Sequence, residues 1–231
     1  MTKNQKASEA ITIVIEDETA KKPDAKYTAK IKMNSKLLVT PKKKTIPAKD
    51  GKKEKIQYPI HVQWGKAEGA AKYKVYAGYC GDKNLKLVKT TKGTSCTFSR
   101  LKGKKIDPEK NVKVYVVAYD KNGKKIAKSN EAHAAGFNNP DETNINSIEI
   151  RLTKDTLAVR ETLLAETNLT KADDTKNVLA HVKQVIRFAS SNPNVATVNP
   201  YGMITGVGKG TCTIYAYAEN GRSAKVKVTI Q

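Results

Sequence analysis

Two runs of alternating side chains near the C-terminus constrain the fold more than any other feature of the chain. Residues 211–218 read TCTIYAYA and residues 224–230 read AKVKVTI, so polar and apolar side chains alternate with a period of two. This period predicts strands with one buried face. Tyr215 and Tyr217 fall on the outward face of the first run, and Asn220-Gly221 is a strong signal for a hairpin turn. We therefore predict a half-buried β-hairpin.

The same organisation extends upstream of this hairpin. Residues 199–202 (NPYG) separate the apolar runs at 195–198 and 203–207, and residues 207–210 (VGKG) turn the chain again. Short alternating strands with turn signals about every ten residues are typical of a β-sandwich.

A second set of alternating runs occupies the first half of the chain. It predicts strands at residues 60–64, 73–77 and 112–118, with a hairpin turn at 120–123. Residues 29–39 alternate on both sides of Asn34-Ser35, which predicts a first strand with a bend. The polar residues 41–55 predict an exposed segment that leaves the sheet. Together these runs predict another sandwich that precedes the C-terminal one.

The C-terminal strands resemble the group 2 bacterial immunoglobulin-like domains, whose motif runs S-S-N-P-x-V-A-T-V, a turn ending in Gly, then G-x-G-T-A-T-I. Phe188 stands where the family usually has Trp, and Cys212 where it usually has Ala, and both keep an apolar side chain inward. The resemblance implies an immunoglobulin-like sandwich. The matching residues are Ser190, Ser191, Asn192, Pro193, Val195, Ala196, Thr197, Val198, Gly202, Gly210, Thr211, Thr213 and Ile214.

The earlier runs resemble a fibronectin type III domain of the bacterial surface type. Val112 stands where that family has its corner tyrosine. The whole chain, over about residues 28–230, resembles the Ig-like repeat-bearing surface proteins of gut clostridial bacteria, which implies export to the cell surface. The residues that match the fibronectin type III pattern are Trp64, Gly69, Ala70, Tyr73, Val75, Tyr76, Leu101, Gly103, Val114, Val116 and Ala118.

We therefore expect an all-β chain of two tandem immunoglobulin-like β-sandwiches with an N-terminal arm. Within residues 1–27 the alternating run Ile11 to Ile15 fits a stray strand, the tail of a preceding segment or an ordered arm. Arg160 replaces a family glycine, so we expect that turn to take another shape, and residues 176–186 fit either a helical turn or an inserted loop. The expected boundaries are 1–27 for the arm or tail, 28–136 for the fibronectin type III-like sandwich, 137–146 for a linker and 147–231 for the group 2 bacterial Ig-like sandwich.

The net charge of the chain limits the kinds of partner that it can bind. It carries 43 Lys and Arg against 22 Asp and Glu, a formal net charge of +21, which attracts anions and repels other copies. We expect a monomer, with an anionic cell-wall polymer, a glycan or a host surface protein as possible partners. Arg suits base and phosphate recognition and is scarce here, so we expect no nucleic acid. No apolar run is long enough for membrane insertion, and we expect any signal peptide and anchor to lie outside this chain.

We consider two groups of side chains as a ligand surface. Tyr76, Tyr115 and Tyr119 share the outward face of two strands, where they would stack on sugars or dock a protein, or else form cross-strand pairs that stabilise the sheet. The densest run of positive charge lies in the exposed segment 41–55 and would bind an anionic polymer. Its members are Lys42, Lys43, Lys44, Lys52, Lys53 and Lys55.

The sequence lacks the patterns that catalysis and metal binding usually require. His61, His133 and His181 are far apart in the chain, and there is no C-x-x-C pair. Asp173-Asp174 fits a solvated turn better than a calcium loop. Cys80 and Cys96 have opposite strand parity, so we expect no disulfide between them, and we expect Cys212 to be a buried free thiol.

We accordingly expect no enzyme activity, no cofactor and no metal. The expected function is that of a non-catalytic module of a secreted or cell-surface bacterial protein, a spacer or adhesin. The alternatives are a binder of anionic envelope polymer or host glycan, and an accessory region of a larger surface enzyme.

Overall fold

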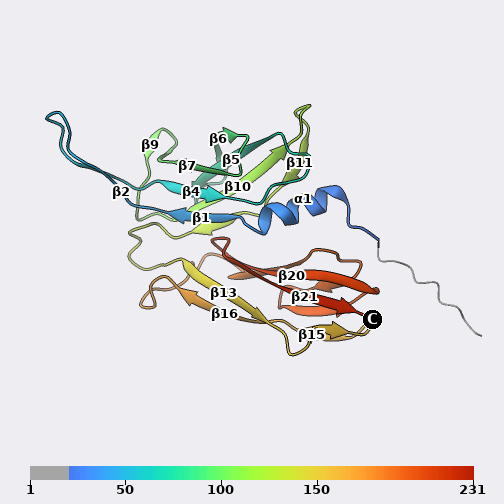
Figure 1. The fold of residues 1–231 in the computed structure, drawn as a ribbon. Coiled ribbons are helices and arrows are strands. Elements are labelled where there is room, and N and C mark those ends of the chain that lie inside the picture. Colours follow the sequence, from blue (N-terminus) through green and yellow to red (C-terminus); the bar gives the residue numbers. More distant parts are fainter. Residues whose placement is uncertain (1–20) are drawn as a thin grey trace, which may run out of the picture.

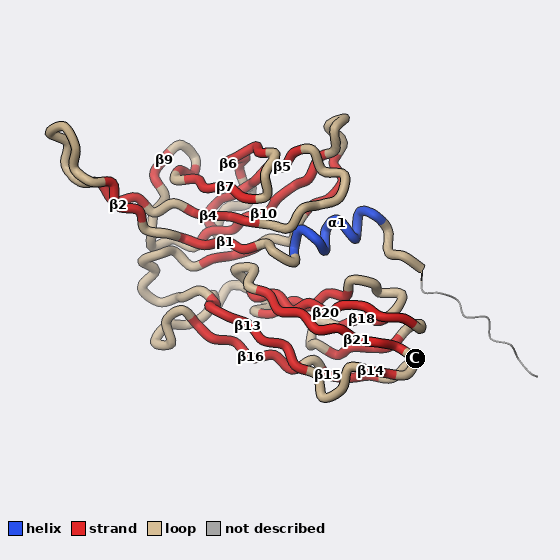
Figure 2. Tube along the Cα trace, in the orientation of Figure 1, coloured by secondary structure: helices blue, strands red, loops and turns tan. Residues whose placement is uncertain are grey.

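The computed structural model describes residues 21–231, so the alternating run Ile11 to Ile15 lies outside the described residues. These residues form an all-β fold in two bodies, drawn one above the other in Figures 1 and 2. One cluster of buried apolar side chains spans residues 29–134 and a second spans residues 148–230. Within residues 21–231 no helix has the length and apolar character that a membrane crossing requires. The predicted all-β fold with two sandwiches is confirmed.

The first sandwich packs a three-stranded sheet, β1-β4-β7, on a five-stranded sheet, β11-β10-β5-β6, in which β12 also pairs with β10. Val62 from the first sheet and Val75 and Val116 from the second are completely buried in the shared core. The strands are β1 (Leu38–Pro41), β2 (Lys44–Ile46), β3 (Lys55–Gln57), β4 (Ile60–Gln63), β5 (Lys72–Tyr79), β6 (Lys86–Thr91), β7 (Ser95–Phe98), β8 (Arg100–Leu101), β9 (Lys104–Lys105), β10 (Val112–Tyr119), β11 (Lys125–Lys128) and β12 (Ala132–Ala134).

The second sandwich contains the sheets β14-β21-β20-β17, β15-β19-β18 and β13-β16. The predicted hairpin is β20 with β21: Ile214 lies opposite Val226, and Lys225 and Lys227 are exposed. The strands are β13 (Ile145–Arg151), β14 (Thr156–Leu157), β15 (Thr162–Leu164), β16 (Glu166–Lys171), β17 (Ile186–Ser190), β18 (Ala196–Val198), β19 (Met203–Gly206), β20 (Gly210–Ala218) and β21 (Ser223–Ile230).

The prediction of a bent strand over residues 29–39 is wrong for its first half. Residues Ala25–Asn34 form helix α1, which begins where the Asp24 carboxylate accepts a hydrogen bond from Tyr27 N at 2.7 Å. The helix lies between the two sandwiches (Figure 1), so it buries side chains on more than one face. Ala29 and Met33 enter the first core, whereas Ile31 is buried outside both cores. Burial from two sides produces an alternation that resembles a strand.

Three further details of the second sandwich bear on the predictions made from the sequence. Tyr217 is not on a solvent face: it is buried, although it belongs to neither core cluster. Arg160 has a left-handed backbone with φ of 70°, a conformation that glycine adopts more readily than arginine. Residues 177–185 form a loop rather than a helical turn.

The turn of the β20–β21 hairpin joins the two sandwiches. Asn220 O accepts a hydrogen bond from Val39 N at 2.9 Å, and Glu219 O accepts one from His133 N at 2.7 Å. At Gly221, with φ of 90°, an added Cβ would lie 1.8 Å from the carbonyl oxygen of Leu37. The turn therefore packs backbone against backbone on the first sandwich, at a spacing that only glycine allows.

Candidate functional site

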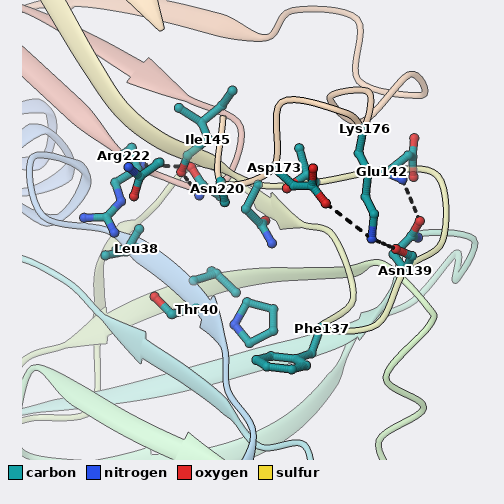
Figure 3. Close-up of a pocket in the computed structure, with 16 residues that line it drawn as sticks. Leu38, Thr40, Phe137, Asn139, Glu142, Ile145, Asp173, Lys176, Asn220 and Arg222 are labelled. Atoms are coloured by element: carbon teal, nitrogen blue, oxygen red, sulfur yellow. Dashed lines mark hydrogen bonds and ion pairs between the residues drawn. The ribbon is translucent and has the colours of Figure 1, made fainter. Parts of the chain in front are cut away.

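A cavity of about 310 Å³ lies between the sandwiches, beside this turn (Figure 3). Strand β1 contributes Leu38 and Thr40, and the segment that joins the sandwiches contributes Asn139. The second sandwich contributes Lys176 and Asn220. The cavity is thus a gap in the contact between the two bodies.

The polar groups of this cavity are used to hold its walls together. Lys176 Nζ donates to Asn139 O at 2.8 Å and lies 3.8 Å from Asp173 Oδ2. Asn220 Nδ2 donates to Ile145 O at 2.8 Å, and Glu142 Oε1 accepts from Ala180 N at 2.8 Å. These bonds order the segment expected to be a linker. They also engage Lys176, Asp173 and Glu142 in structural contacts, so these side chains are not a free acid–base pair.

A carboxylate is buried directly after β20, at Glu219, one residue before Asn220 of the cavity wall. Glu219 is 1% exposed, and neither of its carboxylate oxygens has a hydrogen-bond partner among the described residues. Burial raises the pKa of Glu219 to about 7, while the Arg187 guanidinium acts in the opposite direction. Burial also lowers the pKa of Arg187, whose Nε is likewise buried without a partner in the described chain. The contact between the sandwiches therefore contains an acid that titrates near neutral pH.

Cys80, His133 and His181 converge at the edge of the same contact. The Cys80 Sγ lies 3.5 Å from His133 Nδ1, which lies 3.3 Å from His181 Nε2. Burial raises the pKa of Cys80 to about 12 and lowers the pKa of His133 to about 4. Sequence spacing did not reveal this cluster, because its members are separated by 53 and 48 residues. All three cysteines are free, and Cys212 is buried as predicted.

The three predicted tyrosines come together on the outer face of the five-stranded sheet. Tyr76 and Tyr115 are directly opposite on β5 and β10, and their rings stack at 4.9 Å with an interplanar angle of 17°. Lys128 Nζ lies 3.9 Å from the centre of the Tyr115 ring, and Lys74 Nζ lies 5.2 Å from that of Tyr119. Each tyrosine is half-buried. The rings thus make cross-strand and cation–π contacts within the sheet.

The predicted lysines lie apart from the tyrosines. They belong to the segment that contains the β2–β3 hairpin, which projects from the three-stranded sheet of the first sandwich (Figure 1). The tyrosines lie on the other sheet, so the two groups do not form one surface. None of the six enters an ion pair among the described residues, and all are exposed: Lys42, Lys43, Lys44, Lys52, Lys53 and Lys55.

Comparison with known proteins relates the second sandwich to a bacterial family. Residues 147–229 match the family model described as the bacterial Ig-like domain (group 2). A 95-residue stretch, 41% of this chain, is 28% identical to the A type blood N-acetyl-alpha-D-galactosamine deacetylase of Flavonifractor plautii. The chain spans only 11% of that enzyme's length.

Two solved structures also align with most of the chain. One is a C-terminal 282-residue fragment of intimin in complex with the intimin-binding domain of its translocated receptor, with a TM-score of 0.26 and 14% identity over 77% of this chain and 59% of the fragment. The other is the FN1–FN3 domains of chicken CNTN1, with a TM-score of 0.30 and 10% identity over 82% of this chain and 65% of that one. The chain is therefore an all-β protein whose second sandwich is similar in sequence to the group 2 bacterial Ig-like domains.

Proposed function

We propose that the chain is a non-catalytic module of an exported bacterial surface protein, in which the two sandwiches act together as a stiff spacer. The family match over residues 147–229 supports the bacterial origin and the extracellular location. The further assignment to the Ig-like repeat proteins of gut clostridial bacteria belongs to the same proposal. In this proposal residues 28–136 are a fibronectin type III-like domain, residues 137–146 join the domains, and residues 147–231 are the Ig-like domain.

The close packing of the Gly221 turn on Leu37 is the observation that carries the proposal. Tandem domains move relative to each other unless an extensive contact fixes them. Here helix α1 adds a second contact, because Met33 is buried in the first core while the Tyr27 hydroxyl donates to Ser190 O in the second sandwich. Two separate contacts resist rotation about the connecting segment, which is the property that a spacer needs.

Rotational diffusion measured by NMR relaxation tests this proposal. The two sandwiches of the wild-type chain are expected to share one correlation time. Gly221→Ala should separate the two correlation times, because the added methyl group meets backbone that must move. Gly123→Ala is the matched control, since Gly123 also has a positive φ of 80° but an added Cβ there meets nothing within 4 Å. Independent tumbling of the wild-type sandwiches would refute the spacer.

A second candidate is an accessory region of a larger surface enzyme that acts on glycans. The similarity of 95 residues to a blood-group deacetylase favours it. As a separate alternative, the exposed lysines of the β2–β3 segment hold an acidic glycan or envelope polymer by charge. Retention on a sulfated glycan should then fall steeply up to about 0.5 M salt, and replacing the six lysines by glutamine should abolish it. Salt-independent retention of the wild-type chain argues against this role.

A further inference from the structure

Three side chains with metal-binding atoms meet where the sandwiches touch. Cys80 directly follows β5 and His133 lies on β12, so both belong to the first sandwich. His181 lies in the loop between β16 and β17 of the second sandwich. The sulfur and one nitrogen of each ring all lie within 4.8 Å of one another.

Two of the three separations between these atoms match the edges of a tetrahedral zinc site, and the third pair, Cys80 and His181, lies within 4.8 Å. Zinc binds imidazole nitrogen at about 2.0–2.1 Å and thiolate sulfur at about 2.3 Å, which places two nitrogens about 3.3 Å apart and nitrogen and sulfur about 3.5 Å apart. The observed distances are 3.3 Å between His133 and His181 and 3.5 Å between Cys80 and His133. A single ring nitrogen has either one proton or one lone pair, so His133 Nδ1 cannot satisfy both neighbours by hydrogen bonding. One cation satisfies all three.

The surroundings hold the loop of His181 in place and leave the site accessible. His133 Nε2, the nitrogen that faces away from the cluster, lies 3.9 Å from Glu131 Oε2, which is too long for a hydrogen bond but places a negative charge beside the ring. The loop that carries His181 is held where Ala180 N donates to Glu142 Oε1 at 2.8 Å. Cys80 and His181 line a surface hollow of about 670 Å³, through which an ion and a water ligand can enter.

We propose that Cys80, His133 and His181 bind one zinc ion that cross-links the two sandwiches. A thiolate with two imidazoles selects a borderline-soft cation such as zinc over calcium or magnesium, which prefer oxygen ligands. Because two ligands come from the first sandwich and one from the second, binding holds the domains together. This inference does not depend on the chain being a spacer.

Cobalt and zinc titrations of the full chain, first freed of metal with a chelator, test the site. Cobalt is expected to bind one equivalent, with a thiolate charge-transfer band and the strong d–d absorption of tetrahedral coordination, and zinc is expected to displace it. Cys80→Ser and His181→Ala should each weaken zinc binding on the order of 100-fold or more, since even the groups behind a ligand matter 10–100-fold. The matched controls are Cys96→Ser and His61→Ala, whose side chains lie outside the cluster.

The outcomes separate a bridging site from scattered surface binding. Zinc should raise the unfolding temperature of the wild-type chain and of His61→Ala but not that of His181→Ala. The His181 side chain is exposed, so its replacement does not disturb a core. Absence of the thiolate band, or equal zinc affinity in Cys80→Ser and His61→Ala, overturns the site. Full affinity in His181→Ala overturns the cross-link.

Discussion

Replacing Glu219 by glutamine should change how the stability of the chain depends on pH. The carboxylate is 1% exposed and its oxygens have no hydrogen-bond partner in the described chain. Burial raises its pKa from 4.5 to about 7. A pKa difference of this size corresponds to about 3 kcal/mol of unfolding free energy.

The sign follows from which state holds the proton. Between about pH 4.5 and 7 folded Glu219 keeps its proton while the unfolded chain loses it, so stability falls as pH rises through this window. His133 acts in the opposite direction. Burial lowers its pKa from 6.5 to about 4, with smaller effects of His181, Glu131, Arg187 and Lys113, so stability falls as pH drops below 6.5. The two effects oppose each other, which makes the wild-type profile shallow.

Urea unfolding from about pH 4.5 to 8, in the presence of a chelator, measures this effect. Glu219→Gln should gain about 3 kcal/mol relative to wild type between the ends of the range, and its own stability should now rise with pH between about 4.5 and 6.5 because His133 remains. Glu149→Gln is the control, because that side chain is 55% exposed. A difference between wild type and Glu219→Gln that is the same at every pH would refute the reasoning.

Substitutions at three positions test other parts of the fold by urea unfolding. Arg160→Gly should stabilise the chain by about 0.5–1 kcal/mol because φ is 70° there, whereas Arg160→Ala, which keeps the strain, should not. Asp24→Ala removes the cap of α1 and should cost about 1 kcal/mol, with no loss contradicting the capping role. Ile214→Ala opens a cavity at a completely buried position of the second core and should cost about 2–5 kcal/mol, and a cost near zero would contradict that core.

The sequence by itself determined the strands whose partners are near in the chain. The β20–β21 hairpin follows from an alternation with period two and an Asn-Gly turn, both readable within residues 211–230. For Tyr76 and Tyr115 the local period gave only the outward face of each ring, and the pairing of their strands was an expectation from the fibronectin type III resemblance. Local pattern suffices in these places because each residue's environment is set by its own strand.

Only the tertiary structure decided what happens between the sandwiches. Helix α1 is buried from two sides, so its apolar spacing imitates a strand, and Tyr217 is buried although the period of its strand places it on the outward face. The packing of the two sandwiches brings His181 to Cys80 and His133. The local sequence pattern does not predict these contacts. The interface between two folded domains is formed by residues that lie far apart in the chain.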